Sequence, residues 1–248
     1  MVVAQTRAEF LKLLRVPAFS IFSLAFPLVL YAFFGLPNAT NHFDNGVNVG
    51  AYILASLATY GVVSVMLFSF GIGVANERSQ RMNVLIRATP LPGWVALLSK
   101  VFTALAFALA AQLLLYILGV AAGGVHLSAA QWLQLLVSLL LGSLPFIALG
   151  FGIGYSVSPN VAPALVNLIF LPLSFASGLF VPLTQMPRIV QNVAPYLPTY
   201  QLGQLGWAAI GATTPNVGRQ VLWLALWGAG FTFFALRAYG REETKEFG

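Results

Sequence analysis

The sequence is poor in charge and contains no cysteine. Only 7% of its 248 residues are Asp, Glu, Lys or Arg, whereas a soluble domain carries about 25%. So small a charged fraction cannot cover a water-facing surface, which argues against a soluble enzyme. The absence of cysteine excludes disulfides, thiolate catalysis, zinc–thiolate sites and iron–sulfur clusters. The composition instead fits a chain whose main solvent is lipid.

Long apolar runs take the place of the missing charges. From Val101 to Pro187 there is no Asp, Glu, Lys or Arg, which leaves room for three membrane helices of about 20 residues each. Runs such as LLVSLLLG lack the period-two alternation of an outer-membrane barrel. We therefore predict an all-α membrane protein with six transmembrane helices, at about 17–36, 50–75, 95–122, 132–157, 161–181 and 219–239. Pro145 and Pro172 should kink or interrupt two of them.

The basic residues predict the orientation, because they lie in short clusters between the apolar runs. If both termini are cytoplasmic, only Arg188 and Arg219 of the 12 Lys and Arg residues lie outside. The others are then cytoplasmic: Arg7, Lys12, Arg15, Arg78, Arg81, Arg87, Lys100, Arg237, Arg241 and Lys245. We predict a multi-pass protein of the plasma or inner membrane. The net charge of +6 does not indicate nucleic-acid binding, because no basic face or stripe accompanies it.

Three segments outside the apolar runs are expected to carry the functional contacts of a single transmembrane domain, 1–248. Residues 1–16 predict an amphipathic helix on the membrane surface. The polar loop 76–94 predicts a short amphipathic helix that either docks a soluble partner or lies on lipid. The outer segment 182–218 contains five prolines and an apolar part too short to cross a bilayer. It predicts a re-entrant or interfacial element of broken helices.

Groups that could perform catalysis are scarce. His42 and Asp44 lie in one outer loop, but two such residues do not make a metal site, and a solvated loop is the better interpretation. No GxSxG, HExxH or Walker GxxxxGK[ST] motif occurs, so the chain cannot hydrolyse ATP by the usual P-loop route. Gln112 and Asn167 are the notable polar side chains inside the spans. Either they bond neighbouring helices or they face a substrate path.

Two segments resemble the permease subunits of type-2 ABC exporters. ERSQRMNVLIRATPLPGWVALLSK (77–100) is similar to that family's acidic–basic start after the second span, coupling helix, Thr-Pro and Lys at the opening of the third span. ASGLFVPLTQMPRIVQNVAPYLPTY (176–200) resembles the family's small-Gly-hydrophobic-Pro entry into an outer broken helix, followed by a Leu-Pro step. Asn83 stands where family members often have Gly, which leaves the local shape of the coupling helix open.

The resemblance implies a half-transporter that pairs with a second permease copy, as a homodimer, and binds two copies of a separate ATPase subunit. The chain would hold no cofactor itself, since ATP and Mg would bind to the ATPase. A hydrophobic or amphipathic substrate such as a drug, antibiotic or lipid is expected, with a polysaccharide or lipid-linked glycan as an alternative. ATPase closure would push the coupling helix, about 78–88.

The resemblance also assigns residues to mechanical roles. It implies ATPase coupling by Glu77, Arg78, Arg81, Met82, Leu85 and Ile86. Arg7, Phe10 and Lys12 would act in the N-terminal interface helix. Phe175, Phe180 and Pro182 would lie near the outer gate. Gln112 and Asn167 remain candidates for the substrate path.

Other classes of function share parts of this pattern. A non-transporting membrane scaffold or assembly subunit would bind partners without substrate-dependent ATP turnover. An ATP-independent carrier would work without any ATPase, although the spans lack the ionisable groups that usually carry protons. An intramembrane enzyme is disfavoured because the spans contain no acid–base pair. An ATPase that co-purifies with the chain would separate these classes.

Overall fold

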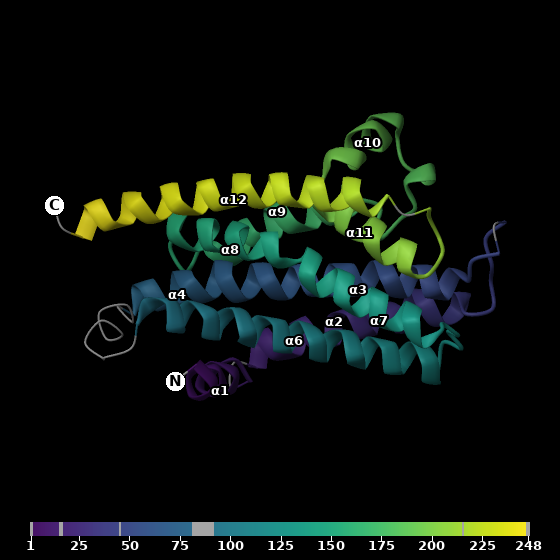
Figure 1. Ribbon diagram of the computed structural model, residues 1–248, viewed down its shortest axis with the longest axis horizontal. Helices are drawn as coiled ribbons and strands as arrows, with labels where there is room; N and C mark the ends of the chain where they lie inside the picture. The colour runs from purple at the N-terminus through teal and green to yellow at the C-terminus, as the bar shows by residue number, and fades with distance from the viewer. Residues whose placement is uncertain (1, 15–16, 45, 81–91, 215, 247–248) are drawn as a thin grey trace.

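A computed structural model describes residues 2–14, 17–44, 46–80, 92–214 and 216–246 as a bundle of helices (Figure 1). The long helices run roughly side by side, whereas α1 (Val2–Leu14) is seen nearly end-on and so lies across the bundle. α1, the start of α6 (Gly93–Ala121) and the end of α12 (Val217–Glu246) share one end of the bundle. We call this the termini end and the opposite one the loop end.

Helices account for almost all of the described residues. The chain continues from α1 into α2 (Pro17–Leu30), the π-turn η1 (Tyr31–Gly35) and the short η2 (Leu36–Asn38). A second run consists of α3 (Val49–Leu67), the π-turn η3 (Phe68–Ile72) and α4 (Gly73–Ser79). The remaining membrane-type helices, besides α6 and α12, are α7 (Ala129–Gly142), α8 (Leu144–Ser156) and α9 (Ala162–Ala176). The segment before α12 holds η4 (Leu183–Gln185), α10 (Arg188–Val193), η5 (Ala194–Tyr196) and α11 (Pro198–Ala209).

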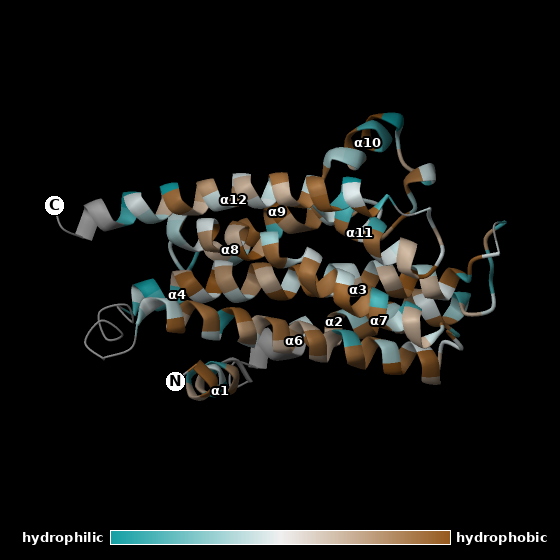
Figure 2. Ribbon diagram, in the orientation of Figure 1, coloured by the Kyte–Doolittle hydropathy of each residue, from teal (hydrophilic) through white to brown (hydrophobic). Residues whose placement is uncertain are grey.

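The expectation of an all-helical membrane protein is confirmed for the described residues, whose only strand-like pairing is one bridge between His42 and Asn48. Four helical runs are long and apolar enough to cross a membrane: Val49–Ser79, Gly93–Ala121, Ala129–Ser156 and Val217–Glu242. Two shorter apolar helices, Ser23–Asn38 and Ala162–Ala176, occupy the first and fifth of the six expected spans. Hydrophobic residues fill the middle of the helices, and polar residues gather towards the ends (Figure 2).

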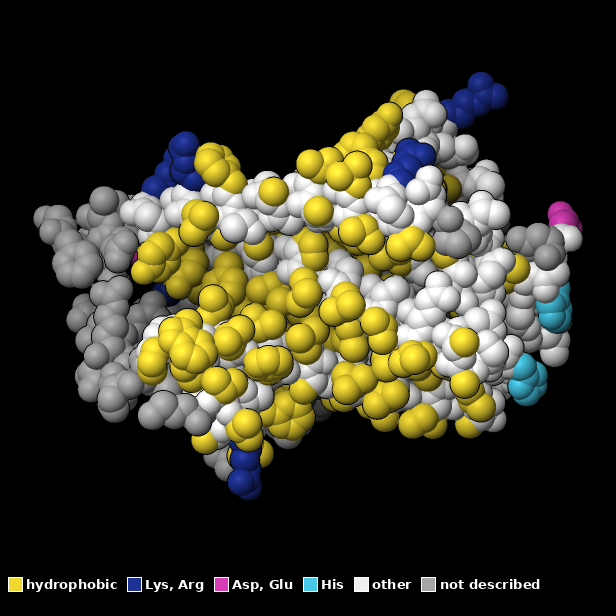
Figure 3. All heavy atoms as spheres, in the orientation of Figure 1, with side chains coloured by type: hydrophobic (Ala, Val, Ile, Leu, Met, Phe, Trp, Pro, Cys, Tyr) yellow, Lys and Arg dark blue, Asp and Glu magenta, His cyan; other side chains and the backbone are white. Residues whose placement is uncertain are grey.

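The α3–α4 run forms the centre of the bundle. Asn48 caps its start by accepting a 2.9 Å hydrogen bond from the amide of Ala51. In its most apolar stretch 83% of the residues are buried, against 17% in α12. A helix buried on every side can be apolar all round, whereas most of α12 is left uncovered by the other described helices. Hydrophobic side chains accordingly spread across the face of the molecule shown in Figure 3, with histidines at the loop end.

Proline and glycine shape the fourth apolar run. α7 ends at Gly142 and α8 restarts at Leu144, where Pro145 occupies the first turn, a position that needs no backbone N–H. Pro172, by contrast, lies inside α9, which continues past it. Further along α8, a Cβ at Gly154 would lie 2.9 Å from the carbonyl oxygen of Phe70. Only glycine therefore allows this close approach of α8 to the central helix.

The described residues 182–214 form short helices, of which α11 enters the bundle. α11 packs against α3, α7 and α12 and is largely buried. The indole Nε1 of Trp207 donates a 2.8 Å hydrogen bond to the hydroxyl of Ser56 on α3. The same ring stacks on Tyr52 with 5.2 Å between centroids. These contacts hold α11 against the central helix at the loop end.

Candidate functional site

The N-terminal helix α1 docks across the termini end of α6. Ser99, Thr103 and Phe107 follow one another at four-residue spacing and so share one face of α6. The Thr103 hydroxyl, which donates to Ser99 in its own helix, also lies 3.3 Å from the carbonyl oxygen of Thr6. The ring of Phe107 meets that of Phe10 at 4.7 Å. Small hydroxyl side chains allow the two helices to approach closely, and the aromatic pair closes the contact.

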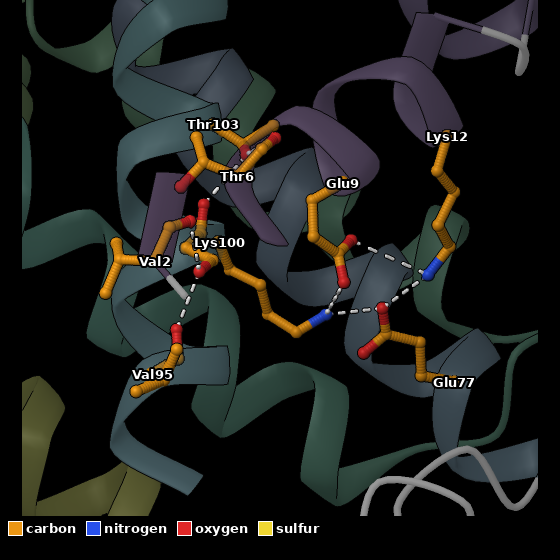
Figure 4. Close-up of polar contacts among 9 residues, drawn as sticks. Val2, Thr6, Glu9, Lys12, Glu77, Val95, Lys100 and Thr103 are labelled. Carbon is orange, nitrogen blue, oxygen red and sulfur yellow. Dashed lines mark hydrogen bonds and ion pairs between the residues drawn. The ribbon is translucent and has the colours of Figure 1, made fainter. Parts of the chain in front are cut away.

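Four charged side chains join α1, α4 and α6 in one cluster (Figure 4). Glu77 is its centre: one carboxylate oxygen accepts hydrogen bonds from Lys12 at 2.7 Å and from Lys100 at 2.5 Å. Glu9 completes the cluster with longer ion pairs, 3.8 Å to Lys12 and 3.6 Å to Lys100. We call these residues, Glu9, Lys12, Glu77 and Lys100, the Glu77 cluster. Two acids and two bases make it electrically neutral.

Burial gives the Glu77 cluster its strength. The side chains of Glu77 and Lys100 are 12% and 18% exposed, so solvent screens their attraction only partly. Burial alone lowers the pKa of Lys12, but the hydrogen bond and the charge of Glu77, with help from Glu9, outweigh it and hold that pKa above its ordinary value. Lys12 therefore stays charged at neutral pH. A cavity of about 190 Å³ lies beside the cluster, lined also by Phe68, Asn76 and Gln80.

Arg78, the next residue after Glu77, binds a different set of helices. Its guanidinium donates a 2.6 Å hydrogen bond to the carbonyl oxygen of Gly154 at the end of α8. It also forms an ion pair with Glu242 near the end of α12. The guanidinium lies 5.6 Å from the centroid of the Tyr155 ring. Because α8 ends at Ser156, the hydrogen bond from Arg78 satisfies a carbonyl group, that of Gly154, which the helix itself leaves unpaired.

The structure thus brings together some of the residues that the sequence assigns to coupling. Glu77 and Arg78 lie at the end of α4 and are both engaged within the subunit. In α1, Phe10 and Lys12 face the bundle, while Arg7 is exposed. The polar side of α1 therefore faces other helices rather than only water. The coupling candidates Arg81, Met82, Leu85 and Ile86 lie outside the described residues.

Two of the three expected gate residues, Phe175 and Phe180, belong to a row of aromatic rings between α9 and the central helix. Phe175 meets Phe180 at 4.6 Å, and Phe180 meets Tyr60 at 5.2 Å. Tyr60 in turn stacks on Phe170 at 4.6 Å. We call these four residues the aromatic row. Pro182 follows it at the start of η4.

Gln112 and Asn167, the candidates for the substrate path, are hydrogen-bonded within their own helices. Gln112 on α6 is buried and accepts a 2.5 Å hydrogen bond from the hydroxyl of Tyr116. Asn167 on α9 is half-buried and donates to the carbonyl oxygen of Pro163 at 2.9 Å. Their placement in a substrate path stays a prediction. Among the described residues, no group of three His, Asp or Glu side chains is arranged to hold a metal ion.

Sequence reasoning missed several residues of this end of the bundle. Glu9 and Glu242 were not assigned roles, although Glu9 pairs with Lys12 and Glu242 pairs with Arg78. Lys100 entered only as the basic opening of a span. The sequence did contain a signal for these pairs. The chain has only six acidic residues, and an acidic residue near a membrane helix usually has a basic partner. Which base each acid pairs with depends on helix packing that a sequence pattern does not specify.

Comparison with known proteins agrees with this architecture. The sequence pattern of the family described as "ABC-2 family transporter protein" matches residues 37–237. The chain is also similar to the Bacillus subtilis (strain 168) protein named "Putative transport permease YvfS", with 28% identity over 212 residues, which cover 86% of each chain.

Proposed function

Because the chain belongs to the ABC-2 family of transporter proteins, we propose that it is the permease subunit of an ABC exporter for a hydrophobic or amphipathic substrate. The family membership makes it a multi-pass transmembrane permease that works with an ATPase subunit. We assign the ATPase to a separate chain, because residues 1–248 contain no Walker GxxxxGK[ST] motif. Catalysis of ATP hydrolysis is then not a task of this subunit.

The proposal includes six membrane crossings with both termini in the cytoplasm. Four helical runs are long enough to cross alone, and the shorter apolar helices Ser23–Asn38 and Ala162–Ala176 supply the first and fifth crossings. The shared position of α1, the start of α6 and the end of α12 agrees with an even number of crossings (Figure 1). The excess of Lys and Arg at that end favours the cytoplasmic side.

The observation that carries the proposal is the arrangement of Glu77 and Arg78 directly before the loop 81–91. Through these two side chains the end of α4 is tied to α1, α6, α8 and α12. A force that an ATPase applies to the end of α4 would therefore reach four other helices through these side-chain contacts. Such rigid links between a docking segment and the spans are what mechanical coupling needs.

The substrate path and its outer gate complete the proposal. The aromatic row, with exposed Phe175 at one end and buried Tyr60 and Phe170 at the other, offers apolar surface but no charge. Such a lining suits a drug, an antibiotic or a lipid more than an ion. We propose that two copies of the chain form the path between them, with two copies of the ATPase.

Co-purification with the neighbouring gene products tests this function. We expect a stoichiometric P-loop ATPase to accompany the tagged chain in mild detergent, and its ATP turnover to fall in Glu77→Gln and Arg78→Gln. Arg219→Gln, which removes an exposed charge at the loop end, is the matched control and should retain turnover. A homogeneous complex without an ATPase would refute the exporter and favour the scaffold or the ATP-independent carrier. Normal ATP turnover in both variants would show that the end of α4 does not couple the ATPase to the spans.

A further inference from the structure

A second cavity opens at the termini end, between the last turns of α8 and α12. Its volume is about 620 Å³, which is in the range of small-ligand sites. Among the described residues, its charged lining consists of Arg78, Arg237, Arg241 and Glu242, which are three basic side chains and one acidic side chain. Tyr155, Ser156 and Ser158 add hydroxyl groups to the same lining. We call this space the arginine cavity.

Arg78 has one polar atom that the subunit does not satisfy. Its terminal nitrogens bind the carbonyl of Gly154 and the carboxylate of Glu242. Its Nε is buried and has no hydrogen-bond partner among the described residues. A buried cationic donor without an acceptor costs free energy. An anionic oxygen in the cavity is the type of partner that this group lacks.

Arg237 and Arg241 continue an apolar stripe on α12. Phe233, Arg237 and Arg241 are spaced four residues apart and so share one face of the helix. The guanidinium carbon of Arg237 lies 4.8 Å from the centroid of the Phe233 ring, a distance that suits a cation–π contact. Phe233 and Leu236 are 59% and 65% exposed. Basic side chains therefore stand beside hydrophobic ones near this end of α12 (Figure 3).

We propose that the arginine cavity binds the phosphate headgroup of an anionic phospholipid. Arginine forks match phosphate oxygens in geometry and charge. Inorganic phosphate shares that chemistry, but the exposed apolar residues that adjoin the arginines on α12 favour a ligand with acyl chains. The change from apolar to basic along one helix face marks the depth at which lipid headgroups lie. Such a lipid would join the ends of α8 and α12 beside the Arg78–Glu242 pair.

Native mass spectrometry of the full chain released from lipid nanodiscs tests the proposal. The probes are phosphatidylglycerol and phosphatidylcholine with identical acyl chains. We expect the wild type to retain phosphatidylglycerol preferentially, and Arg237→Gln and Arg241→Gln each to weaken retention by about tenfold, the scale of one lost charge-assisted hydrogen bond. Arg188→Gln removes an exposed charge from α10 at the loop end and should behave as the wild type. Thermal unfolding without added lipid checks that all the variants remain folded.

Two results would overturn the proposal. One is equal retention of the two lipids by the wild type, or undiminished preference in the folded double variant Arg237→Gln/Arg241→Gln. The other comes from competition: if millimolar inorganic phosphate displaces the bound phosphatidylglycerol, the cavity recognises free phosphate and the acyl chains contribute nothing. The proposal is supported if bound phosphatidylglycerol resists displacement by inorganic phosphate and the arginine variants retain less of it.

Discussion

Glu77 and Arg78 are neighbours in the chain, yet they bind opposite parts of the bundle. Glu77 accepts hydrogen bonds from Lys12 on α1 and Lys100 on α6, whereas Arg78 binds the ends of α8 and α12. Consecutive residues on a helix point about 100° apart, which allows one turn of α4 to reach both sides. This turn directly precedes residues 81–91, to which we assign ATPase docking.

Removal of the central carboxylate should weaken the contact of α1 with the bundle. In Glu77→Gln, Lys12 and Lys100 lose the negative charge of their closest acceptor and remain partly buried, with ion pairs only to the more distant Glu9. We expect the free energy of unfolding to fall by about 1–3 kcal/mol, measured by thermal unfolding in mild detergent. Glu9→Gln, which removes only pairs of 3.6 Å or more, should cost less. An equal loss in both variants would show that Glu77 is not the centre of the cluster.

The bonds of Arg78 should be separable by a double-mutant cycle. Glu242→Gln removes the ion pair alone, whereas Arg78→Gln also removes the bonds to the carbonyls of Gly154 and Val157. We expect Arg78→Gln to lower the unfolding temperature more, and the double variant to be no worse than Arg78→Gln. Residues that share one interaction behave non-additively in this way. Additive losses would mean that the two side chains act independently.

The anchor of α11 can be tested at the buried hydrogen bond between Trp207 and Ser56. Ser56→Ala leaves the indole N–H of Trp207 buried without an acceptor, which should cost about 1–3 kcal/mol in the free energy of unfolding. In a Trp207→Phe background the same change should cost much less, because no donor remains. Ser138→Ala, which removes only a hydrogen bond within α7, serves as the control. If Ser56→Ala destabilises Trp207→Phe as much as it destabilises the wild type, the hydrogen bond between Trp207 and Ser56 does not anchor α11.

The turn between α9 and η4 should require glycine at position 178. Gly178 has φ +78°, and a Cβ there would lie 3.0 Å from Cγ of Leu183. Gly178→Ala therefore combines backbone strain of about 1–2 kcal/mol with a clash. Gly211 has the same φ but open space around it, so Gly211→Ala should show the strain alone. Gly230→Ala, in the middle of α12 with open space, should not destabilise. Thermal unfolding should rank the three variants in this order.

The fold class followed from local properties of the chain. Low charge and long apolar runs are sufficient to predict membrane helices, because a bilayer leaves unpaired backbone groups no partner. The same reasoning expected a break near Pro145 and short helices in 182–218, whereas the roles of Glu77 and Arg78 came from the family resemblance. It expected Pro172 to kink or interrupt its helix; α9 is not interrupted there, since neighbouring helices decide whether a proline breaks a membrane helix.

Pairings between distant parts of the sequence were decided only by the tertiary structure. Composition already located Lys12, Glu77 and Lys100 near the same membrane surface. It could not show that Glu77 binds both lysines, or that Arg78 reaches Glu242 across 164 positions of sequence. Hydrophobic patterning specifies which residues enter the lipid, but it is nearly the same on every side of α3 and α6. Which faces meet is set by close contacts at small residues such as Gly154, and these exist only once the helices pack.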